Sequence, residues 1–312
     1  MSADGKSLKH DAFPYGSDEA LVEAMAPFLR DGLAQGHAAV GIVSPRNIAV
    51  LKDALGSDAT RVHWFDAAAF FVRPAAAIAE LDAVIWELTS DGRPLVRLVT
   101  ELPFGPTIDE QAAWTRYEAI VNRAFERSPL WAVCLYDTRT LPPQVVRDAD
   151  RTHQAVWEGD RRKPGPGLVD PAVLLREIPE PTWTPVGEPT LRLTIDAGQD
   201  GWRDPVTMAV AHGGLPDDRV QDFLVAVTEV VANALQHGDD TAELVLWVAA
   251  AGVVCEVRDH GQGLDDPFVG FLPPGGDTAP RGMGLWVARQ LSDTLAIESG
   301  PEGTTVRLAI GR

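Results

Sequence analysis

The order of apolar and polar positions divides the first half of the chain into alternating helices and short apolar strands. Apolar residues recur at helical spacing from Ser17 to about Gly36, and the continuous apolar run AAVGIV follows at residues 38–43. The alternation continues with helices expected at residues 48–55, 75–90 and 109–127 and strands expected at residues 62–65, 95–104 and 130–136. Apolar strands separated by helices indicate a parallel sheet covered on both faces. We therefore predict an α/β domain with a mainly parallel sheet over residues 1–158, of which residues 1–10 form a frayed terminus.

The pattern breaks down over residues 159–189, where proline and glycine are frequent. Seven prolines lie in this stretch, at positions 164, 166, 171, 179, 181, 185 and 189. Proline removes a backbone donor and stiffens the chain. We expect an extended, semi-rigid linker, interrupted by a short helix at residues 171–177.

A different pattern begins at residue 190. Residues 191–195 alternate between apolar and polar, as in a half-buried antiparallel strand. Helices are expected at residues 204–212, 217–237 and 284–292, and further strands at residues 244–248, 253–258, 295–299 and 304–310. This order predicts an α+β sandwich over residues 190–312, with helices on one face of a mixed, mostly antiparallel sheet.

Composition narrows the possible partners. The 312 residues carry a formal net charge of −18, which argues against nucleic acid or an anionic membrane as the main partner. Cys134 and Cys255 lie in Val-rich apolar runs and are expected to be buried thiols, neither a disulfide nor a metal site. The N-terminus lacks the apolar segment of a signal peptide, and no apolar run approaches the roughly 20 residues that cross a bilayer. We expect a soluble, cytoplasmic protein.

The helix expected at residues 217–237 carries polar side chains on an otherwise apolar stretch. Glu229, Asn233 and His237 lie at i, i+4 and i+8, so they share one helix face. Burying a carboxylate and an amide without partners is costly. Either local hydrogen bonds satisfy them, or they face a polar ligand such as a metal–phosphate group. On these residues alone, the local explanation is the more frequent one.

A second motif, VRDHGQG, occupies residues 257–263. Asp259 ends an expected strand, where its carboxylate could accept a hydrogen bond from an exocyclic amine. Gly261 and Gly263 follow it, and glycine allows the backbone to come close to a ligand.

Two further motifs follow, RGMGL at residues 281–285 and EGTT at residues 302–305. Gly282 and Gly284 open a helix, whose N-terminal N–H groups and dipole favour phosphate. Arg281 adds a guanidinium group suited to a phosphoryl oxygen. Among the earlier residues, Asn233 offers a neutral oxygen to Mg²⁺.

The four motifs in this order resemble the GHKL (Bergerat) ATP-binding fold shared by gyrase, histidine kinases and anti-sigma-factor serine kinases. The resemblance spans about residues 190–311 and rests on Glu229, Asn233, Asp259, Gly261, Gly263, Gly282, Gly284 and Thr304. It implies ATP and Mg²⁺ as cofactors, with Mg²⁺ on Asn233 and the adenine amine on Asp259, near Thr304. It also implies that the Gly282–Gly284 turn holds the phosphates. The short segment between Gly263 and Arg281 is similar to the anti-sigma branch.

The first domain resembles the MEDS-type sensory domain, on residues 10–15, Glu101, the helix around residues 114–125 and the CLYD sequence at residues 134–137. Such domains are similar to a reduced form of the recombinase-type ATPase fold. Here Ser44-Pro45-Arg46-Asn47 stands where a Gly-Lys-Ser/Thr loop would bind phosphate, so we expect no ATP hydrolysis in this domain. The domain would sense or dock something, or it would be a scaffold without a ligand.

The resemblance leads to a functional hypothesis that depends on Glu229. Anti-sigma serine kinases carry a glutamate at this position, where it can take the proton of an acceptor hydroxyl. A histidine kinase would instead need a helical hairpin with an exposed histidine, and the nearest candidate, His153, is followed by no long helix pair. We expect an ATP-dependent serine/threonine kinase that phosphorylates a STAS-type anti-sigma-factor antagonist, regulates stress-response transcription and also binds a sigma factor. The resemblance further implies a homodimer.

Two alternatives remain open at this point. The protein could be a nucleotide-gated binding protein without kinase activity, in which ATP only sets the conformation that holds a partner. The second alternative is a sensor histidine kinase.

Overall fold

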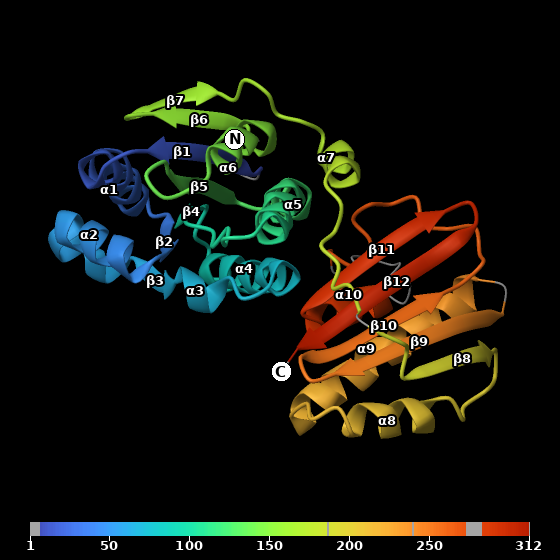
Figure 1. Ribbon diagram of the computed structural model, residues 1–312. Coiled ribbons are helices and arrows are strands. Elements are labelled where there is room, and N and C mark those ends of the chain that lie inside the picture. Colours follow the sequence, from blue (N-terminus) through green and yellow to red (C-terminus); the bar gives the residue numbers. More distant parts are fainter. Residues whose placement is uncertain (1–6, 186, 239, 273–282, 312) are drawn as a thin grey trace. The chain divides into compact units, whose positions relative to one another are not determined.

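The computed structural model describes residues 7–185, 187–238, 240–272 and 283–311. The chain folds into two compact units, Met1–Ile178 and Pro179–Arg312 (Figure 1). Each unit has its own sheet and its own hydrophobic core.

The N-terminal unit is built on a seven-stranded sheet with the order β3-β2-β4-β5-β1-β6-β7. All its strand pairs are parallel except β6 with β7, which is antiparallel. The strands are β1 (Lys9–Tyr15), β2 (Ala38–Val43), β3 (His63–Asp66), β4 (Val96–Thr100), β5 (Leu130–Asp137), β6 (Ala155–Glu158) and β7 (Arg161–Pro164). The four strands at the centre are almost entirely buried, as the prediction of a parallel sheet covered on both faces requires.

Helices cover both faces of this sheet (Figure 1). They are α1 (Asp18–Ala34), α2 (Pro45–Leu55), α3 (Ala67–Phe70), α4 (Pro74–Thr89), α5 (Ile108–Ala124), α6 (Pro143–Thr152) and α7 (Pro171–Glu177), with a 3₁₀ turn η2 (Gly56–Arg61). The pair α1 and α2 packs on one face, where the apolar side of α1 meets Phe13, Val99 and Val133. Helices α5 and α6 pack together on the other face.

The sequence prediction is wrong for the start of the chain. Lys9 and His10, expected to belong to a frayed terminus, begin β1, which lies between β5 and β6. The strand escapes the apolar pattern because it contains His10, Asp11 and Pro14. Both His10 and Asp11 are fully buried, and both depend on partners far away in the sequence.

The predicted linker over residues 159–189 differs from the structure in its first half. Residues of this stretch form β7, which pairs with β6, and α7, which packs on α5. The Arg116 guanidinium donates to the backbone carbonyls of Leu175, at 2.6 Å, and Ile178. Proline-rich sequence is therefore compatible here with a folded edge of the N-terminal unit. The helix expected at residues 171–177 is confirmed.

The C-terminal unit is a five-stranded antiparallel sheet with the order β11-β12-β10-β9-β8. Its elements are β8 (Leu191–Asp196), α8 (Arg203–Ala211), α9 (Asp217–His237), β9 (Thr241–Ala249), β10 (Gly252–Arg258), α10 (Met283–Leu291), β11 (Thr294–Gly300) and β12 (Gly303–Gly311). Apolar residues of all three helices join the inward residues of the strands in one core. The result is an α+β sandwich with helices on one face of the sheet, as predicted, but the described strands pair only antiparallel where a mixed sheet was expected.

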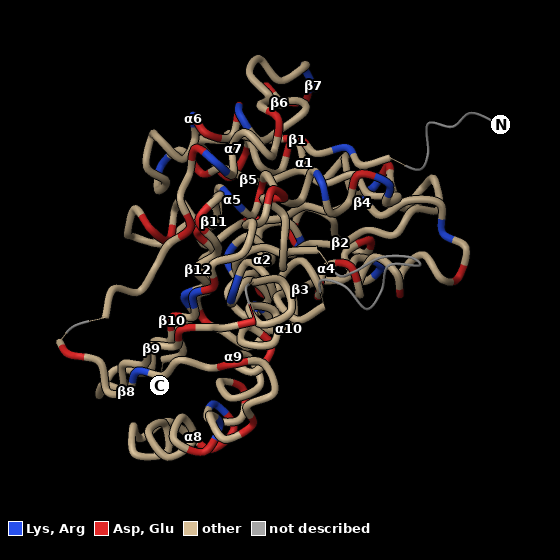
Figure 2. The backbone as a smooth tube through the Cα atoms, turned by 90° about the vertical axis from the view of Figure 1, so that its right-hand side faces the viewer, with Lys and Arg blue, Asp and Glu red and all other residues tan. Residues whose placement is uncertain are grey.

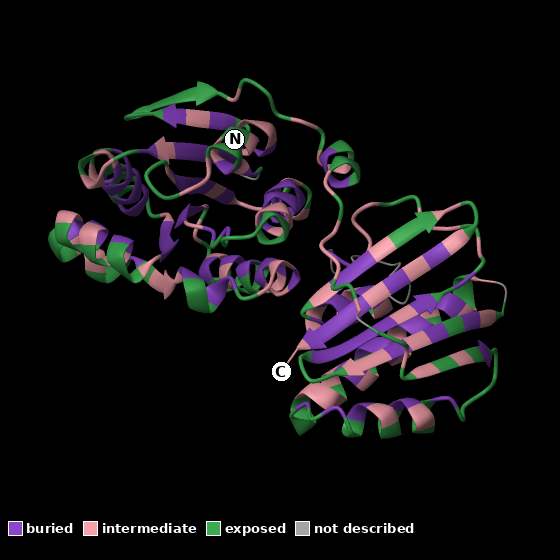
Figure 3. Ribbon diagram, viewed as in Figure 1, coloured by how far each residue is buried: buried purple, intermediate pink, exposed green. Residues whose placement is uncertain are grey.

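Helix α9 has a buried apolar face because its apolar residues recur three or four positions apart. Phe223, Val227, Val230 and Val231 are almost completely buried between the sheet and α10. In Figure 3 buried and more exposed positions alternate along the helices and strands of this unit. The half-exposed side of α9 is therefore left for polar side chains.

Acidic residues exceed basic ones, 45 to 27, and occur along both units with Lys and Arg between them (Figure 2). Among the helices that the structure describes, none has both the length and the apolar character needed to cross a membrane.

Candidate nucleotide site

Helix α9 presents Glu229 and Asn233 on its partly exposed side. Both residues are partly buried, one helical turn apart, while His237 at the end of the helix is exposed. Neither Glu229 nor Asn233 makes a side-chain hydrogen bond to another described residue. The local hydrogen bond that could have satisfied both side chains is therefore not formed between Glu229 and Asn233. Among the described residues, nothing occupies the hydrogen-bonding groups of these two side chains.

The first turn of α10 lies directly against Glu229. A Cβ atom placed on Gly284 would be 2.8 Å from Glu229 Oε2, so glycine is what lets the carboxylate lie this close to the helix. The N-terminus of a helix attracts negative charge, because its first N–H groups have no intrahelical partner. This corner therefore offers one carboxylate and one anion-attracting helix end. The predicted phosphate-binding residues Arg281 and Gly282 lie outside the described residues.

Asp259, directly after β10, is the most constrained residue of the predicted set. Its side chain is buried, and Oδ1 accepts hydrogen bonds from the backbone N–H of Gly261, at 2.9 Å, and of Thr304, at 3.2 Å. Its own backbone N–H donates to the carbonyl of Thr304 at 2.9 Å. These bonds fix the carboxylate in one orientation. The second oxygen, Oδ2, accepts no hydrogen bond from a described residue and remains an acceptor.

The glycines around Asp259 allow protein backbone to approach protein backbone. A Cβ on Gly261 would be 2.4 Å from the carbonyl oxygen of His237, and one on Gly263, where φ is +81°, would be 2.3 Å from that of Gly300. The sequence interpretation assigned this close approach to a ligand. In the structure the close approach is to the end of α9 and to the turn before β12, which holds the Asp259 loop in place.

Thr304 is the second residue of β12, next to the Asp259 loop, and is almost completely buried. Its hydroxyl lies 3.1 Å from the hydroxyl of Ser299, which also accepts from the N–H of Leu264 at 2.6 Å. Ser299 was not predicted, and no sequence signal marks a serine at the end of a strand. The structure therefore brings Asp259, Gly261, Gly263 and Thr304 together, and separately brings Glu229 and Gly284 together.

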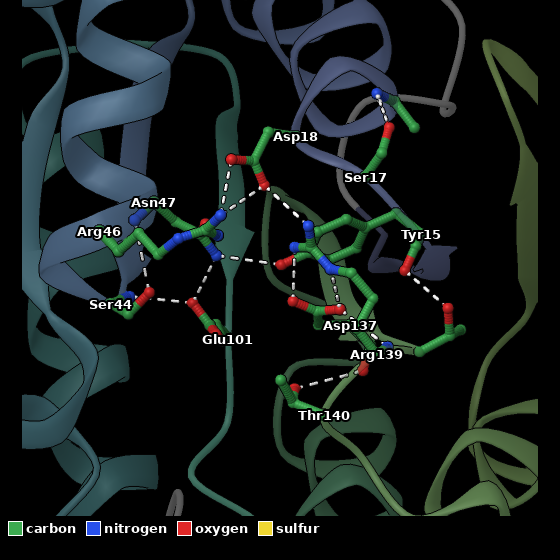
Figure 4. A network of polar contacts seen from close by, with 12 residues as sticks. Tyr15, Ser17, Asp18, Ser44, Arg46, Asn47, Glu101, Asp137, Arg139 and Thr140 are labelled. Atoms are coloured by element: carbon green, nitrogen blue, oxygen red, sulfur yellow. Dashed lines mark hydrogen bonds and ion pairs between the residues drawn. The ribbon is translucent and has the colours of Figure 1, made fainter.

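In the N-terminal unit, polar side chains gather at the carboxyl ends of β1, β2 and β4 (Figure 4). Glu101, after β4, accepts from the backbone N–H of Ser44 at 3.0 Å and from the Asn47 amide at 2.8 Å. The same amide donates to the Tyr15 hydroxyl at 3.1 Å. Ser44 caps α2 by accepting from the N–H of Asn47. The segment Ser44-Pro45-Arg46-Asn47, which stands where a phosphate-binding loop would be, therefore begins helix α2. This edge is where α/β sheets commonly hold ligands.

Two arginines complete that edge. Arg139 pairs with Asp137 at 2.7 Å and with Asp18 at 3.1 Å, and Arg46 pairs with Asp18 at 2.6 Å. Hydrogen bonding to Arg139 lowers the pKa of Asp137, and hydrogen bonding to Arg46 lowers that of Asp18. The charged groups here neutralise one another.

Comparison with known families agrees with this geometry in both units. Residues 9–154 match the profile of the MEDS family, described as the methanogen/methylotroph, DcmR sensory domain. Residues 199–310 match the profile of the histidine kinase-like ATPase domain. The fold and the site thus define a regulator in which a MEDS domain precedes a histidine kinase-like ATPase domain.

Two curated relatives are similar in sequence over part of the chain. They are anti-sigma F factors of Clostridium botulinum, strains Eklund 17B (type B) and Alaska E43 (type E3). Each is 31% identical over 103 residues, which cover 29% of this chain and 70% of the relative. The chain belongs to the anti-sigma F factor family of histidine kinase-like ATPases, with an added N-terminal MEDS domain.

Proposed function

We propose that the C-terminal unit is an ATP-dependent protein serine/threonine kinase of the anti-sigma type. The observation that carries the proposal is the position of Glu229. Its carboxylate has no side-chain partner among the described residues and lies at the first turn of α10, one helical turn from Asn233. A base at such a place can take the proton of an acceptor hydroxyl as the phosphoryl group arrives.

The residues of the unit fit ATP and Mg²⁺. Asp259 keeps Oδ2 as an acceptor for the adenine amine while Oδ1 is held by two backbone N–H groups. Asn233 has an amide oxygen for Mg²⁺, which accepts neutral oxygen ligands and keeps several waters. Gly261, Gly263 and Thr304 would shape the adenine end by holding the Asp259 loop in place, and Arg281, Gly282 and Gly284 would bind the phosphates. Bound ATP would supply the phosphoryl group that is transferred.

The similarity to anti-sigma F factors supports a proposal for the partners. The two relatives are named anti-sigma F factors, which supports binding of a sigma factor by this chain. We propose a STAS-type anti-sigma-factor antagonist as the protein that receives the phosphate on Ser or Thr, and a homodimer as the working form. The MEDS domain would set the activity in response to its ligand, and the protein would act in the cytoplasm on stress-response transcription.

A histidine kinase is disfavoured by the place of His153. This side chain is completely buried in the N-terminal unit, next to Glu118, and cannot meet the phosphate of a nucleotide as it stands. Self-phosphorylation on this histidine would require the unit to open.

The test is a Glu229→Gln variant, which keeps the shape of the side chain and removes the base. We expect ATP affinity within about twofold of the wild type and a loss of phosphate transfer to the antagonist of roughly 100-fold or more. Glu243→Gln, on an exposed position of β9, is the matched control and should transfer phosphate normally. If the Glu229→Gln variant still controls its partner and transfer is absent from the wild type as well, the chain is a nucleotide-gated binding protein instead.

A further inference from the structure

Four side chains of the kinds that bind metals meet inside the N-terminal unit. They are His10, Glu118, Cys134 and His153, exposed by 0%, 1%, 4% and 0%. One ligand atom from each lies within 4.8 Å of the ligand atoms of the other three. They come from β1, α5, β5 and the residue after α6, so segments up to 143 residues apart (10 to 153) converge on one point.

The sheet register explains part of this convergence. His10 on β1 is paired with Ala132 on β5, and Cys134 is two residues further along, so both side chains point to the same face. Helix α5 covers that face with Glu118. The end of α6 brings His153 to the same point.

The hydrogen bonds of Asn122 fix the tautomer of His10. The Asn122 amide nitrogen donates to the carbonyls of Glu118, at 3.2 Å, and Thr152, at 2.7 Å. Its oxygen is therefore the atom that faces His10 Nδ1, at 3.1 Å, and Nδ1 carries the proton. In the neutral ring, Nε2 of His10 then presents a lone pair toward Glu118 Oε2, only 3.0 Å away.

His153 is oriented in the same way. Its Nδ1 lies 2.9 Å from the carbonyl oxygen of Ala149, which can only accept. Its Nε2 is a buried polar atom without a hydrogen-bond partner and lies 3.7 Å from Glu118 Oε2. With the proton on Nδ1, the neutral ring of His153 has its lone pair on Nε2. Two lone pairs and a carboxylate oxygen thus face one another, an arrangement that a cation stabilises.

The distances between the ligand atoms are close to those in a tetrahedral metal centre. Sγ of Cys134 lies 3.3 Å from His10 Nε2 and 3.7 Å from Glu118 Oε2. Zinc–ligand bonds of about 2.0–2.3 Å place neighbouring ligands roughly 3.3–3.6 Å apart in a tetrahedron. We propose that these four side chains bind one Zn²⁺ ion.

The surroundings and the charge fit such a site. Each histidine donates its other ring N–H to a protein oxygen, and the Tyr136 hydroxyl lies 3.1 Å from Glu118 Oε1, as outer partners of metal ligands do. Thiolate and carboxylate together neutralise Zn²⁺. The Cys134 thiol would release its proton when the metal binds, because the thiolate is the form that coordinates zinc. Four protein ligands close the coordination sphere, and the metal ties β1 and β5 to α5 and α6. Cys134 is a free, buried thiol, as predicted; the prediction that it lies outside any metal site did not take account of His10, Glu118 and His153.

The experiment uses the full chain, stripped by a chelator and reconstituted with zinc or with Co²⁺ as a probe. We expect one zinc per chain, and with Co²⁺ the absorption of a tetrahedral ion with a thiolate charge-transfer band. Cys134→Ala should abolish that band and weaken metal binding on the order of 100-fold or more. Cys255→Ala removes the other buried thiol, in the C-terminal unit, and should change neither result.

The wild type alone can decide the matter if Cys134→Ala fails to fold. X-ray absorption of the zinc protein should show one sulfur among nitrogen and oxygen neighbours. Reconstituted protein with far less than one zinc, or a zinc without sulfur, would overturn the proposal and leave the His10–Glu118 contact as a purely structural one. ATP binding by the C-terminal unit does not enter either readout, so this test is independent of the proposed kinase.

Discussion

At the scale of single residues, Asp259 shows how a buried carboxylate can be both satisfied and available. Backbone N–H groups hold Oδ1, and the packed glycines around the loop prevent the side chain from turning. Burying a carboxylate without partners would be costly, and the two backbone donors reduce that cost for Asp259. The free Oδ2 is then a specific acceptor in a fixed direction.

Replacing Asp259 with Asn should separate these two roles. The amide oxygen can still accept from Gly261 and Thr304, so the fold should persist, but an N–H group replaces the acceptor that would face adenine. A hydrogen bond to a charged group is worth about 1.5–3 kcal/mol, so we expect ATP affinity to fall roughly 10- to 150-fold. Calorimetric titration measures the ATP affinity of this variant, and His260→Gln, at an exposed position next to Asp259, is the control. Equal affinities for both variants would rule out Asp259 as the adenine acceptor.

At the scale of elements, helices and strands that bury a face of their own sequence could be predicted, whereas those that depend on distant residues could not. Helices α1 and α9 and the strands β9, β10 and β12 follow from apolar periodicity, because each buries a face built from its own sequence. Strand β1 does not follow, because buried Asp11 depends on Arg162, Trp131 and Trp157, up to 151 residues away. The order of the motifs in the sequence was enough to group the residues of the candidate nucleotide site. The orientation of Asp259 and the contacts of Ser299 could not be predicted from the sequence, because both depend on where the backbone of β11 and β12 lies in the fold.

The turn from β11 to β12 gives an element-scale prediction. Gly303 has φ +121°, and a Cβ there would lie 2.1 Å from the carbonyl oxygen of Asp259. Gly303→Ala should therefore destabilise the C-terminal unit by about 2 kcal/mol or more, because the backbone atom in its way cannot swing aside. Gly300→Ala, in the same turn, meets nothing within 4 Å and should change stability by less than about 0.5 kcal/mol. Urea unfolding followed by circular dichroism compares the two, and identical midpoints would show that the close approach is absent.

At the scale of the whole molecule, tyrosine absorbance distinguishes one unit from the other. The chain has three tyrosines, Tyr15, Tyr117 and Tyr136, and all are buried in the N-terminal unit. Burial raises the pKa of Tyr15 to about 12 and raises those of Tyr117 and Tyr136 well above their usual value. Phenolate absorbance therefore reports on the N-terminal unit alone.

This label predicts an alkaline transition of that unit. The tyrosines of an unfolded chain lose their protons near pH 10, whereas the folded unit keeps them. Its stability is thus complete below about pH 10 and falls as the pH rises from about 10 to 12 and beyond. We expect phenolate absorbance to rise together with loss of the far-ultraviolet dichroism of the unit, and to titrate near pH 10 in denaturant. Phenolate formed near pH 10 in an intact fold would contradict the burial of these rings.

The most direct test of the nucleotide site is a crystal structure of the full chain with a non-hydrolysable ATP analogue and Mg²⁺. The site described above predicts density beside α9 and α10, with the adenine amine on Asp259, the metal on Asn233 and Glu229 near the terminal phosphate. Nucleotide bound elsewhere, or adenine without a contact to Asp259, would contradict the assignment of these residues to one ATP site.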